Sequence, residues 1–277
     1  MPKSVLVVTG IGGMGLAIAR RMGSGVKLVL ADHDTTKLEA AAAALVKDSY
    51  DVTSIPMDIS DRTAVMGLAD KAASLGTLKV LVHTAGVSWI QAGASDPIYR
   101  INLLGTAWML EAFEKFATPG MAGVFISSIA RLFTKVTPEL ADRLARLPAE
   151  ELPTLVDGEL RNEPWTDPET AYSVSKVCNH DRVRAAAVTW GARGARVNTI
   201  SPGGIATNMG RLSMDRSAKA RAMLAITPLE RLGTPEDIAM AADFLAGSKS
   251  MFITGTDLLV DGGVYAAARF GLSPSPR

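Results

Sequence analysis

Tyr172 and Lys176 stand four positions apart in the stretch TAYSVSKVCN, whose residues favour a helix. On a helix, residues four apart lie on the same face, so the phenol and the ammonium would be neighbours. A tyrosine hydroxyl ordinarily loses its proton at about pH 10. An adjacent cation lowers that pKa and would let the tyrosine act as a general acid and base. The same spacing also occurs in solvated surface pairs, so the pair alone decides nothing.

Other polar residues point to the same chemistry. The apolar run GVFIS at residues 123–127 predicts a strand that ends near Ser128. The carboxyl ends of strands are where α/β proteins build ligand sites. Asn102 falls within a segment of helical apolar spacing, and a buried helical asparagine needs a hydrogen-bonding partner. The candidate catalytic residues are Asn102, Ser128, Tyr172 and Lys176.

A glycine turn follows the first apolar run, in the stretch VVTGIGGMGLAIARRM. Gly10, Gly12 and Gly15 fit G-x-G-x-x-G, which lets a pyrophosphate approach backbone N–H groups at a helix N-terminus. Asp32 lies 20 residues after Gly12, where a carboxylate would bind the adenosine ribose of NAD and repel the extra phosphate of NADP. No Lys or Arg lies in the turn or directly after Asp32, so we expect NAD, with NADP less favoured. The alternative is a turn that binds nothing, with Asp32 capping a helix.

The elements that must position these residues are strands and helices in alternation. Continuous apolar strands that alternate with helices are typical of a parallel sheet covered on both faces. We therefore expect an α/β fold, a doubly wound sheet of seven parallel strands, in a single domain over residues 1–272 with a flexible tail at 273–277. Strands are expected at 4–8, 26–31, 53–56, 79–83, 123–127, 195–200 and 257–260, and helices at 35–47, 61–75, 96–116, 169–191 and 235–247.

The segment 131–168 breaks this alternation. It contains five prolines and many charges, and residues 138–147 and 149–156 predict two short helices with proline boundaries. It stands between a predicted strand and the helix of Tyr172. It is therefore expected to be a helical insertion near the active site.

Composition excludes several classes of function. Lys plus Arg is 29 and Asp plus Glu is 28, which gives no general attraction to nucleic acid or anionic lipid. The single cysteine, Cys178, allows no intrachain disulfide and fits a reducing cytoplasm. The sequence shows neither a signal peptide nor an apolar run of about 18 residues, which a membrane span requires. We expect a cytoplasmic protein with a small-molecule substrate and without nucleic acid, membrane or metal.

With these residues in place, the sequence resembles the short-chain dehydrogenase/reductase family over nearly the whole chain. The matching features are the glycine turn, Asp32, MDIS around Asp58, TAG at 84–86, Asn102, Ser128, Tyr172, Lys176 and the loop SPGGIAT. The resemblance implies a Rossmann-type sheet and NAD(P)-dependent interconversion of alcohols and ketones. Ser128 and Tyr172 are 44 positions apart, which resembles the branch that includes bacterial 3α-hydroxysteroid dehydrogenase/carbonyl reductases.

The resemblance also implies a role for each matching residue. Tyr172 would exchange a proton with the substrate oxygen, and Lys176 would lower the tyrosine pKa and bind the nicotinamide ribose. Ser128, rather than Ser127, would bind the substrate oxygen, and Asn102 would hold a water in a proton relay. The implied cofactor contacts are Gly10, Gly12, Met14, Asp32, Asp58, Ile59, Ala85, Gly86, Tyr172, Lys176, Pro202, Gly203, Ile205 and Thr207.

Departures from the family pattern leave alternatives open. The turn TGIGGMG is one residue shorter than usual, and His83 stands where an asparagine is common. His83 either fills the same space or has acquired a function. The insertion covers the substrate, or covers a surface helix that family members use for oligomer contacts, or is a spacer.

By the resemblance, the segment 205–224 would be the family's mobile substrate loop, and its methionines either contact an apolar ligand or pack between helices. Should Trp89 and Trp165 border the pocket, the substrate is apolar and fairly large, such as a cyclic alcohol.

The leading hypothesis is a homo-oligomeric, NAD-dependent oxidoreductase that interconverts a secondary alcohol and a ketone. One alternative is a non-catalytic dinucleotide-binding regulator on the same fold, which would not need all four candidate catalytic residues. Another is a methyltransferase, which has no use for Tyr172 and Lys176 beside Ser128.

Overall fold

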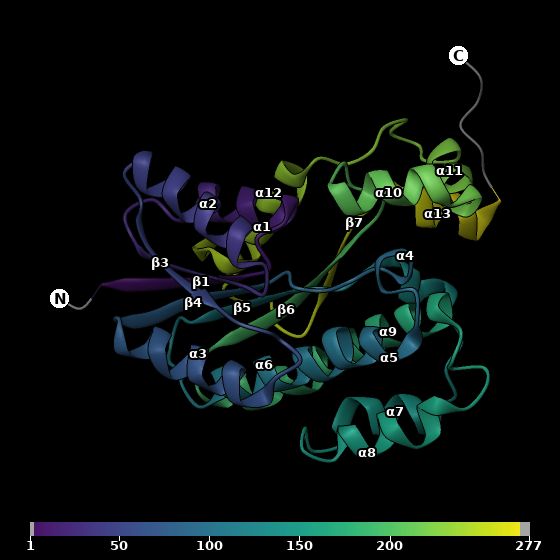
Figure 1. The fold of residues 1–277 in the computed structure, drawn as a ribbon, viewed down its shortest axis with the longest axis horizontal. Coiled ribbons are helices and arrows are strands. Elements are labelled where there is room, and N and C mark those ends of the chain that lie inside the picture. Colours follow the sequence, from purple (N-terminus) through teal and green to yellow (C-terminus); the bar gives the residue numbers. More distant parts are fainter. Residues whose placement is uncertain (1–2, 272–277) are drawn as a thin grey trace.

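Within residues 3–271, which the computed structural model describes, seven parallel strands form one sheet (Figure 1). The strand order β3-β2-β1-β4-β5-β6-β7 changes direction between β1 and β4, where a doubly wound sheet opens its ligand crevice. The predicted sheet is confirmed, and the tail expected at 273–277 lies outside the described residues. The strands are β1 (Ser4–Thr9), β2 (Lys27–Asp32), β3 (Asp51–Pro56), β4 (Thr77–His83), β5 (Ala122–Ile126), β6 (Arg196–Pro202) and β7 (Asp257–Val260).

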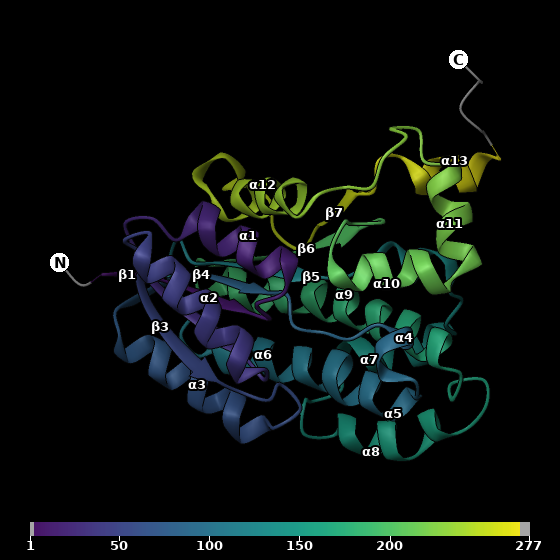
Figure 2. The same ribbon diagram turned by 45° about the horizontal axis from the view of Figure 1, so that its top comes forward.

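Two layers of helices cover the sheet (Figures 1 and 2). Leu6 and Val8 of β1 belong to the core on one face, and Val5 and Val7 belong to the core on the other. Successive strand residues point to opposite faces, so a strand buried on both faces must be apolar throughout. One layer consists of α1 (Gly13–Met22), α2 (Thr35–Lys47) and α12 (Pro235–Ala246), and the other of α3 (Arg62–Ser74), α6 (Gly105–Glu114) and α9 (Pro168–Ala192).

Shorter helices surround the carboxyl ends of the strands. They include α4 (Trp89–Ala92), α5 (Ser95–Ile98), α10 (Asn208–Arg216), α11 (Ala218–Ala225) and α13 (Val264–Phe270), and the 3-10 turns η2 (Ile129–Phe133) and η3 (Glu159–Arg161). A further 3-10 turn, η4 (Ser248–Ser250), lies at the opposite edge of the sheet, between α12 and the start of β7.

The helix predicted at 96–116 is interrupted by a π-helix, η1 (Tyr99–Leu104). The Gly105 N–H reaches back five residues to the Arg100 carbonyl instead of four. Inside this turn, Asn102 is fully buried, and its amide bonds both backbone groups of Val87 at 2.9 Å. Single π-turns are frequent at functional sites. The π-helix therefore coincides with the contact of Asn102 with Val87, in the loop after β4.

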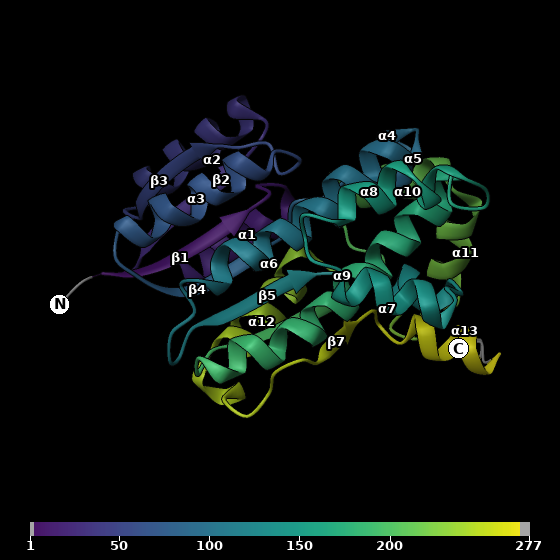
Figure 3. The same cartoon turned by 90° about the horizontal axis from the view of Figure 1, so that it is seen from below.

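The insertion forms α7 (Pro138–Arg146) and α8 (Leu152–Asp157), and α7 packs against α9 (Figure 3). Arg182 of α9 donates to the Leu144 and Leu147 carbonyls at 3.0 and 2.9 Å, and the buried Cys178 thiol also faces Leu144. The second helix begins at Leu152 rather than 149, because Pro153 is tolerated only in the first turn. Helix α7 of the insertion thus covers α9, and Cys178 is the packed core residue of this contact.

Candidate active site

A cavity of about 410 Å³ lies at the carboxyl ends of the strands. Segments that follow β4, β5, β6 and β7 line it, together with the first turns of α1 and α9. Ser128, Tyr172 and Lys176 all face this cavity. The structure therefore brings together three of the four candidate catalytic residues.

Helix α9 presents Tyr172 and Lys176 one turn apart. The helix starts at Pro168 because Asp167 caps it, accepting from the Thr170 N–H at 2.8 Å. The Lys176 ammonium is 5.7 Å from the centre of the Tyr172 ring. The predicted side-by-side placement of the two groups is confirmed.

Lys176 is only 6% exposed, and burial lowers its pKa to about 8. Its ammonium donates to the Ile126 carbonyl at 3.2 Å. An ammonium has three N–H donors, and among the described residues only this one acceptor is within reach. The remaining donors can bind ligand hydroxyls in the cavity.

Burial raises the pKa of Tyr172, and the hydrogen bond with the Ser128 side chain lowers it by less. The sequence predicts the opposite net direction, from the adjacent cation. That prediction is wrong for the chain itself, because the loss of water around the phenolate outweighs the favourable contact. The protonated phenol is therefore the dominant form at neutral pH.

The two serines at the end of β5 have different partners. The Ser127 hydroxyl donates to the Lys176 carbonyl at 3.0 Å and is committed to α9. The Ser128 oxygen accepts from the Ala130 N–H at 3.1 Å. The Ser128 hydroxyl keeps its proton for a neighbouring oxygen, so Ser128 suits the role that the resemblance implies.

Asn102 lies behind the cavity wall. Besides Val87, its amide nitrogen donates to the Ser175 hydroxyl at 3.4 Å. Gly86 passes so close that an added Cβ would be 3.0 Å from the Asn102 oxygen and 3.7 Å from the Lys176 nitrogen. Asn102 thus fixes the loop that carries Ala85 and Gly86, and its part in a proton relay stays a prediction.

The glycine turn leaves room where a phosphate is expected. Gly10 has a φ of +82°, and an added Cβ there would be 2.5 Å from the Ala85 nitrogen. A Cβ on Gly15 would be 1.9 Å from the Gly10 oxygen. At Gly12, by contrast, no described atom lies within 4 Å of the Cβ position. The fold therefore requires glycine at positions 10 and 15, whereas Gly12 leaves open space at the start of α1.

The Asp32 carboxylate holds this turn in place. It accepts from the Ile11 N–H at 2.6 Å and from the Asp34 N–H at 2.9 Å, and the exposed His33 ring is 3.1 Å away. Both carboxylate oxygens retain further lone pairs for ribose hydroxyls. The position of Asp32 next to the glycine turn fits the predicted ribose contact.

The two residues expected at the adenine differ in exposure. The exposed Asp58 accepts from the Ser60 N–H at 2.8 Å. The Ile59 side chain is buried, and a Cβ on Gly105 would be 2.6 Å from it. Only the Ile59 backbone is therefore left for a contact with the adenine.

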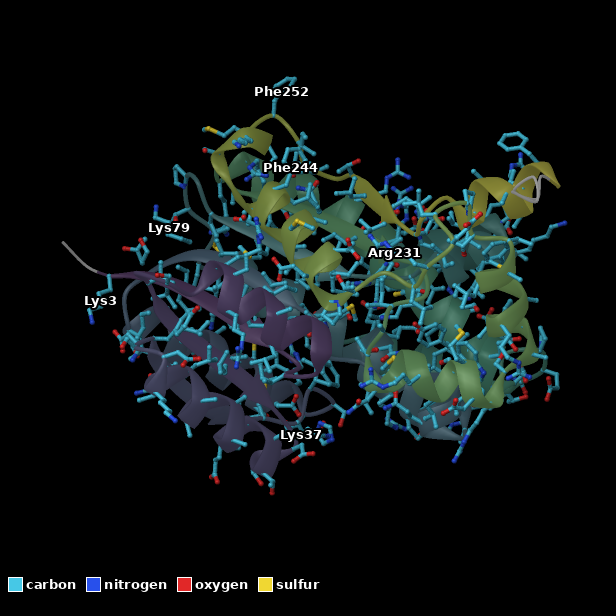
Figure 4. The ribbon with its side chains drawn as sticks, turned by 90° about the horizontal axis from the view of Figure 1, so that it is seen from above. Lys3, Lys37, Lys79, Arg231, Phe244 and Phe252 are labelled. Carbon is cyan, nitrogen blue, oxygen red and sulfur yellow. The ribbon has the colours of Figure 1, made fainter. Side chains whose placement is uncertain are left out.

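Further predicted cofactor residues border the cavity. Thr207 caps α10 by accepting from the Gly210 N–H at 3.0 Å. Ala85 contributes only backbone beside Gly10. Arg231 also lines the cavity, and its guanidinium is bound by Asp237 at 2.7 Å (Figure 4). The predicted residues along this wall are Met14, Gly86, Pro202, Gly203, Ile205 and Thr207.

Taken together, the open space at Gly12, the Asp32 carboxylate and the spare donors of Lys176 fit a nicotinamide dinucleotide.

The sequence is similar to families and proteins of known type. The family described as "short chain dehydrogenase" matches residues 3–136, and the related family described as "Enoyl-(Acyl carrier protein) reductase" matches residues 160–265. Short-chain dehydrogenase/reductase bsc3 of Alternaria brassicicola is 38% identical over 272 residues, which cover 96% of this chain and 97% of that protein. The chain belongs to the short-chain dehydrogenase/reductase family.

Other similarities of this dehydrogenase are more distant. Galactitol 2-dehydrogenase (L-tagatose-forming) of Cereibacter sphaeroides is 30% identical, with 92% of each chain covered. A solved structure of 7α-hydroxysteroid dehydrogenase, complexed with NADH and 7-oxo glycochenodeoxycholic acid, is 25% identical with a TM-score of 0.70, covering 94% of this chain and 93% of that one. The protein is an alcohol dehydrogenase/ketone reductase, and its family binds nicotinamide dinucleotides.

His83 of the dehydrogenase fills a space in the sheet. Its ring nitrogens are 2.7 Å from the Thr9 hydroxyl and 3.2 Å from the Thr106 hydroxyl. Burial and the nearby Lys176 ammonium lower the His83 pKa to about 3, so the ring is neutral. The first alternative, local replacement of an asparagine, fits these contacts.

Two further observations concern residues 3–271 of the dehydrogenase. None of their helices has the length and apolar character that crossing a membrane requires. They also bring together no group of three or more His, Cys, Asp and Glu side chains that could hold a metal ion.

Proposed function

We propose that this enzyme is an NAD-dependent oxidoreductase that interconverts a secondary alcohol and a ketone, with Tyr172 as general acid and base. The Tyr172 and Ser128 side chains, which line the same cavity with Lys176 one helical turn from Tyr172, carry the proposal. A bound nicotinamide dinucleotide would accept or supply the hydride. A regulator without catalysis would have no need for this arrangement.

Ser128, Tyr172 and Lys176 each have a separate role in the proposed reaction. The Ser128 hydroxyl donates to the substrate oxygen and stabilises the charge that develops there. The Tyr172 phenol gives a proton to that oxygen in reduction and takes it back in oxidation. The spare N–H donors of Lys176 bind ribose hydroxyls, and its charge favours the phenolate when oxidation requires it.

Asp32 supports NAD over NADP. A phosphate on the ribose would meet the Asp32 carboxylate, and like charges at this distance repel. The residue next to it is His33, not an arginine that would pair with a phosphate.

The lining of the cavity supports an apolar or cyclic substrate. The Trp89 ring packs against the Tyr172 ring at 5.2 Å, and Met209, Met214 and Met223 contribute adaptable side chains. Trp165 is not among the lining residues. A polyol is the second candidate class, because the relative from Cereibacter sphaeroides is named for galactitol.

Substitution of Tyr172 tests the proposal. Tyr172→Phe should lower turnover by at least about 100-fold, because general acid–base catalysis contributes on that order, while NADH fluorescence titration shows affinity within about threefold of the wild type. Asp32→Ala should reduce the ratio of kcat/KM for NAD over NADP. Retained turnover in Tyr172→Phe would exclude Tyr172 as the acid and base, and an unchanged ratio would exclude Asp32 as the residue that distinguishes the cofactors.

We further propose a homo-oligomer in the cytoplasm. Phe244 of α12 and Phe252 just after η4 are exposed and project from the surface (Figure 4). Association of two copies would remove such side chains from water. Light scattering at micromolar concentration tests this, and a mass of 29.1 kDa would contradict it.

A further inference from the structure

A largely buried ion pair lies next to the cavity wall and has no part in the roles above. The Arg131 guanidinium donates to Asp257 at 2.6 Å and to the Ser201 hydroxyl at 3.2 Å. The side chains of Arg131 and Asp257 are 15% and 8% exposed. The other Asp257 oxygen accepts from the Thr199 and Ser201 hydroxyls at 2.7 and 2.8 Å. Both carboxylate oxygens are therefore satisfied by fixed donors.

This network joins two segments of the active site. Arg131 lies in η2, and its backbone N–H donates to the Ser128 carbonyl at 3.3 Å. Ser201 directly precedes Pro202 and Gly203, which line the cavity. One guanidinium thus connects the turn that starts at Ser128 with the segment expected beside the nicotinamide.

The Arg131–Asp257 ion pair is better suited to fix the relative position of two segments than to increase the stability of the fold. Burial of two charges costs desolvation energy that offsets their attraction, and apolar residues of equal volume often stabilise a fold as well. A guanidinium, however, is planar and offers its donors in fixed directions. The pair therefore specifies one relative placement of the elements that it joins.

Other contacts restrain the same turn. The Ser127 N–H donates to the Ile200 carbonyl at 2.8 Å, which fixes the chain before Ser128. The Phe133 ring packs edge-on against Tyr265 at 5.6 Å, which fixes the end of η2. Between these two anchors, Arg131 supplies the one charged contact of η2 with the β6–β7 edge in the described structure.

We propose that Arg131 is a positioning residue for catalysis, which holds the Ser128 hydroxyl in place relative to Pro202 and Gly203 through Ser201 and Asp257. The inference rests on the proposed function, in which Ser128 binds the substrate oxygen. A misplacement of about 1 Å in such a group costs up to about 100-fold in rate. Loss of Arg131 should therefore lower kcat more than cofactor affinity.

Three variants separate positioning from stability. Arg131→Met leaves the Asp257 carboxylate buried without its cation, so it loses stability as well as rate. The double variant Arg131→Met/Asp257→Asn removes both charges and should unfold at a denaturant midpoint near that of the wild type. Its kcat should nevertheless stay about 10- to 100-fold low, because the bridge from η2 is absent. Arg131→Lys keeps a cation and should recover part of the lost rate.

The controls use residues outside the cavity and a second readout. Arg143→Met breaks an exposed ion pair with Glu159 in the insertion and should leave kcat unchanged. NADH affinity of the double variant should stay within about threefold of the wild type, because the glycine turn and Asp32 are untouched.

The pH profile gives a signal that a structural role would not produce. Ser128 lowers the pKa of Tyr172, so a displaced Ser128 should move the rise of kcat/KM for alcohol oxidation to higher pH. Lys176, the other titratable group beside Tyr172, is unchanged in these variants.

A double variant with wild-type kcat and pH profile would overturn the role of Arg131. Where Arg131→Met does not fold, the other two variants carry the test. Turnover in Tyr172→Phe would instead refute the proposed function itself.

Discussion

Lys176→Met should stabilise the folded protein while it abolishes catalysis. The ammonium of Lys176 is buried with a single carbonyl acceptor at 3.2 Å, so the folded state holds a poorly compensated charge. Methionine has a similar length and needs no hydrogen bond. The Lys176 ammonium contributes to catalysis only when a ligand and the phenolate are present. Its retention therefore lowers the stability of the folded protein in exchange for activity.

The magnitude follows from the lowered pKa. A pKa of about 8 instead of 10.5 means that the charged Lys176 costs the folded state about 3 kcal/mol at pH 7. Loss of the bond to Ile126 offsets about 1 kcal/mol of the gain. We therefore expect Lys176→Met to unfold with a free energy about 2 kcal/mol larger than the wild type at pH 7.

The pH dependence of this difference has a definite sign. Between pH 8 and 10.5, the unfolded state binds the Lys176 proton and the folded state does not. The stability of the wild type therefore rises with pH in this window relative to the variant. At pH 10 less than about 1 kcal/mol of the cost should remain, so the difference should nearly vanish.

Urea denaturation of dinucleotide-free protein at pH 7, 8.5 and 10 measures the effect. Lys249→Met, which changes an exposed lysine of η4, is the matched control and should show no such trend. A Lys176→Met variant that is less stable than the wild type at pH 7, or a difference that does not depend on pH, would show that the buried Lys176 charge does not destabilise the fold.

Two further predictions concern the glycine turn and the sheet. Gly15→Ala should destabilise the fold strongly, because its Cβ would be 1.9 Å from the Gly10 oxygen, whereas Gly12→Ala should keep the wild-type melting temperature and lose at least about tenfold in NADH affinity. Equal effects of the two alanines in melting and titration would contradict this. For His83, the folded pKa of about 3 lies below the ordinary 6.5, so the unfolded state binds more protons between these pH values. Stability should fall by up to about 1.4 kcal/mol per unit as the pH drops through that window, and His83→Asn should remove this contribution; an identical acid slope in both proteins would exclude it.

The sheet could be predicted from the sequence because its central strands are buried on both faces. Such strands need uninterrupted apolar residues, and the runs at β1 and β5 show this directly. Tyr172 and Lys176 could be paired because helical spacing alone places them on one face. Features that follow from the periodicity of a strand or a helix can thus be predicted from the sequence without knowledge of tertiary contacts.

The features that the sequence does not predict depend on contacts between segments that are distant in the chain. The π-helix accompanies the contact of Asn102 with Val87, and Ile59 is buried because Gly105 allows close approach. Arg131 and Asp257 are 126 positions apart, and a single arginine after a strand gives no hint of its partner. The pKa of Tyr172 rises because the site excludes water, which helical spacing does not reveal.

The most direct test of the proposed chemistry is a crystal structure with NADH and a ketone bound. We expect the ketone oxygen within about 3 Å of both the Tyr172 hydroxyl and the Ser128 hydroxyl. We also expect the Lys176 ammonium at the ribose hydroxyls of the cofactor. A ketone whose oxygen contacts neither hydroxyl, while its carbon faces the nicotinamide, would contradict the roles of Tyr172 and Ser128.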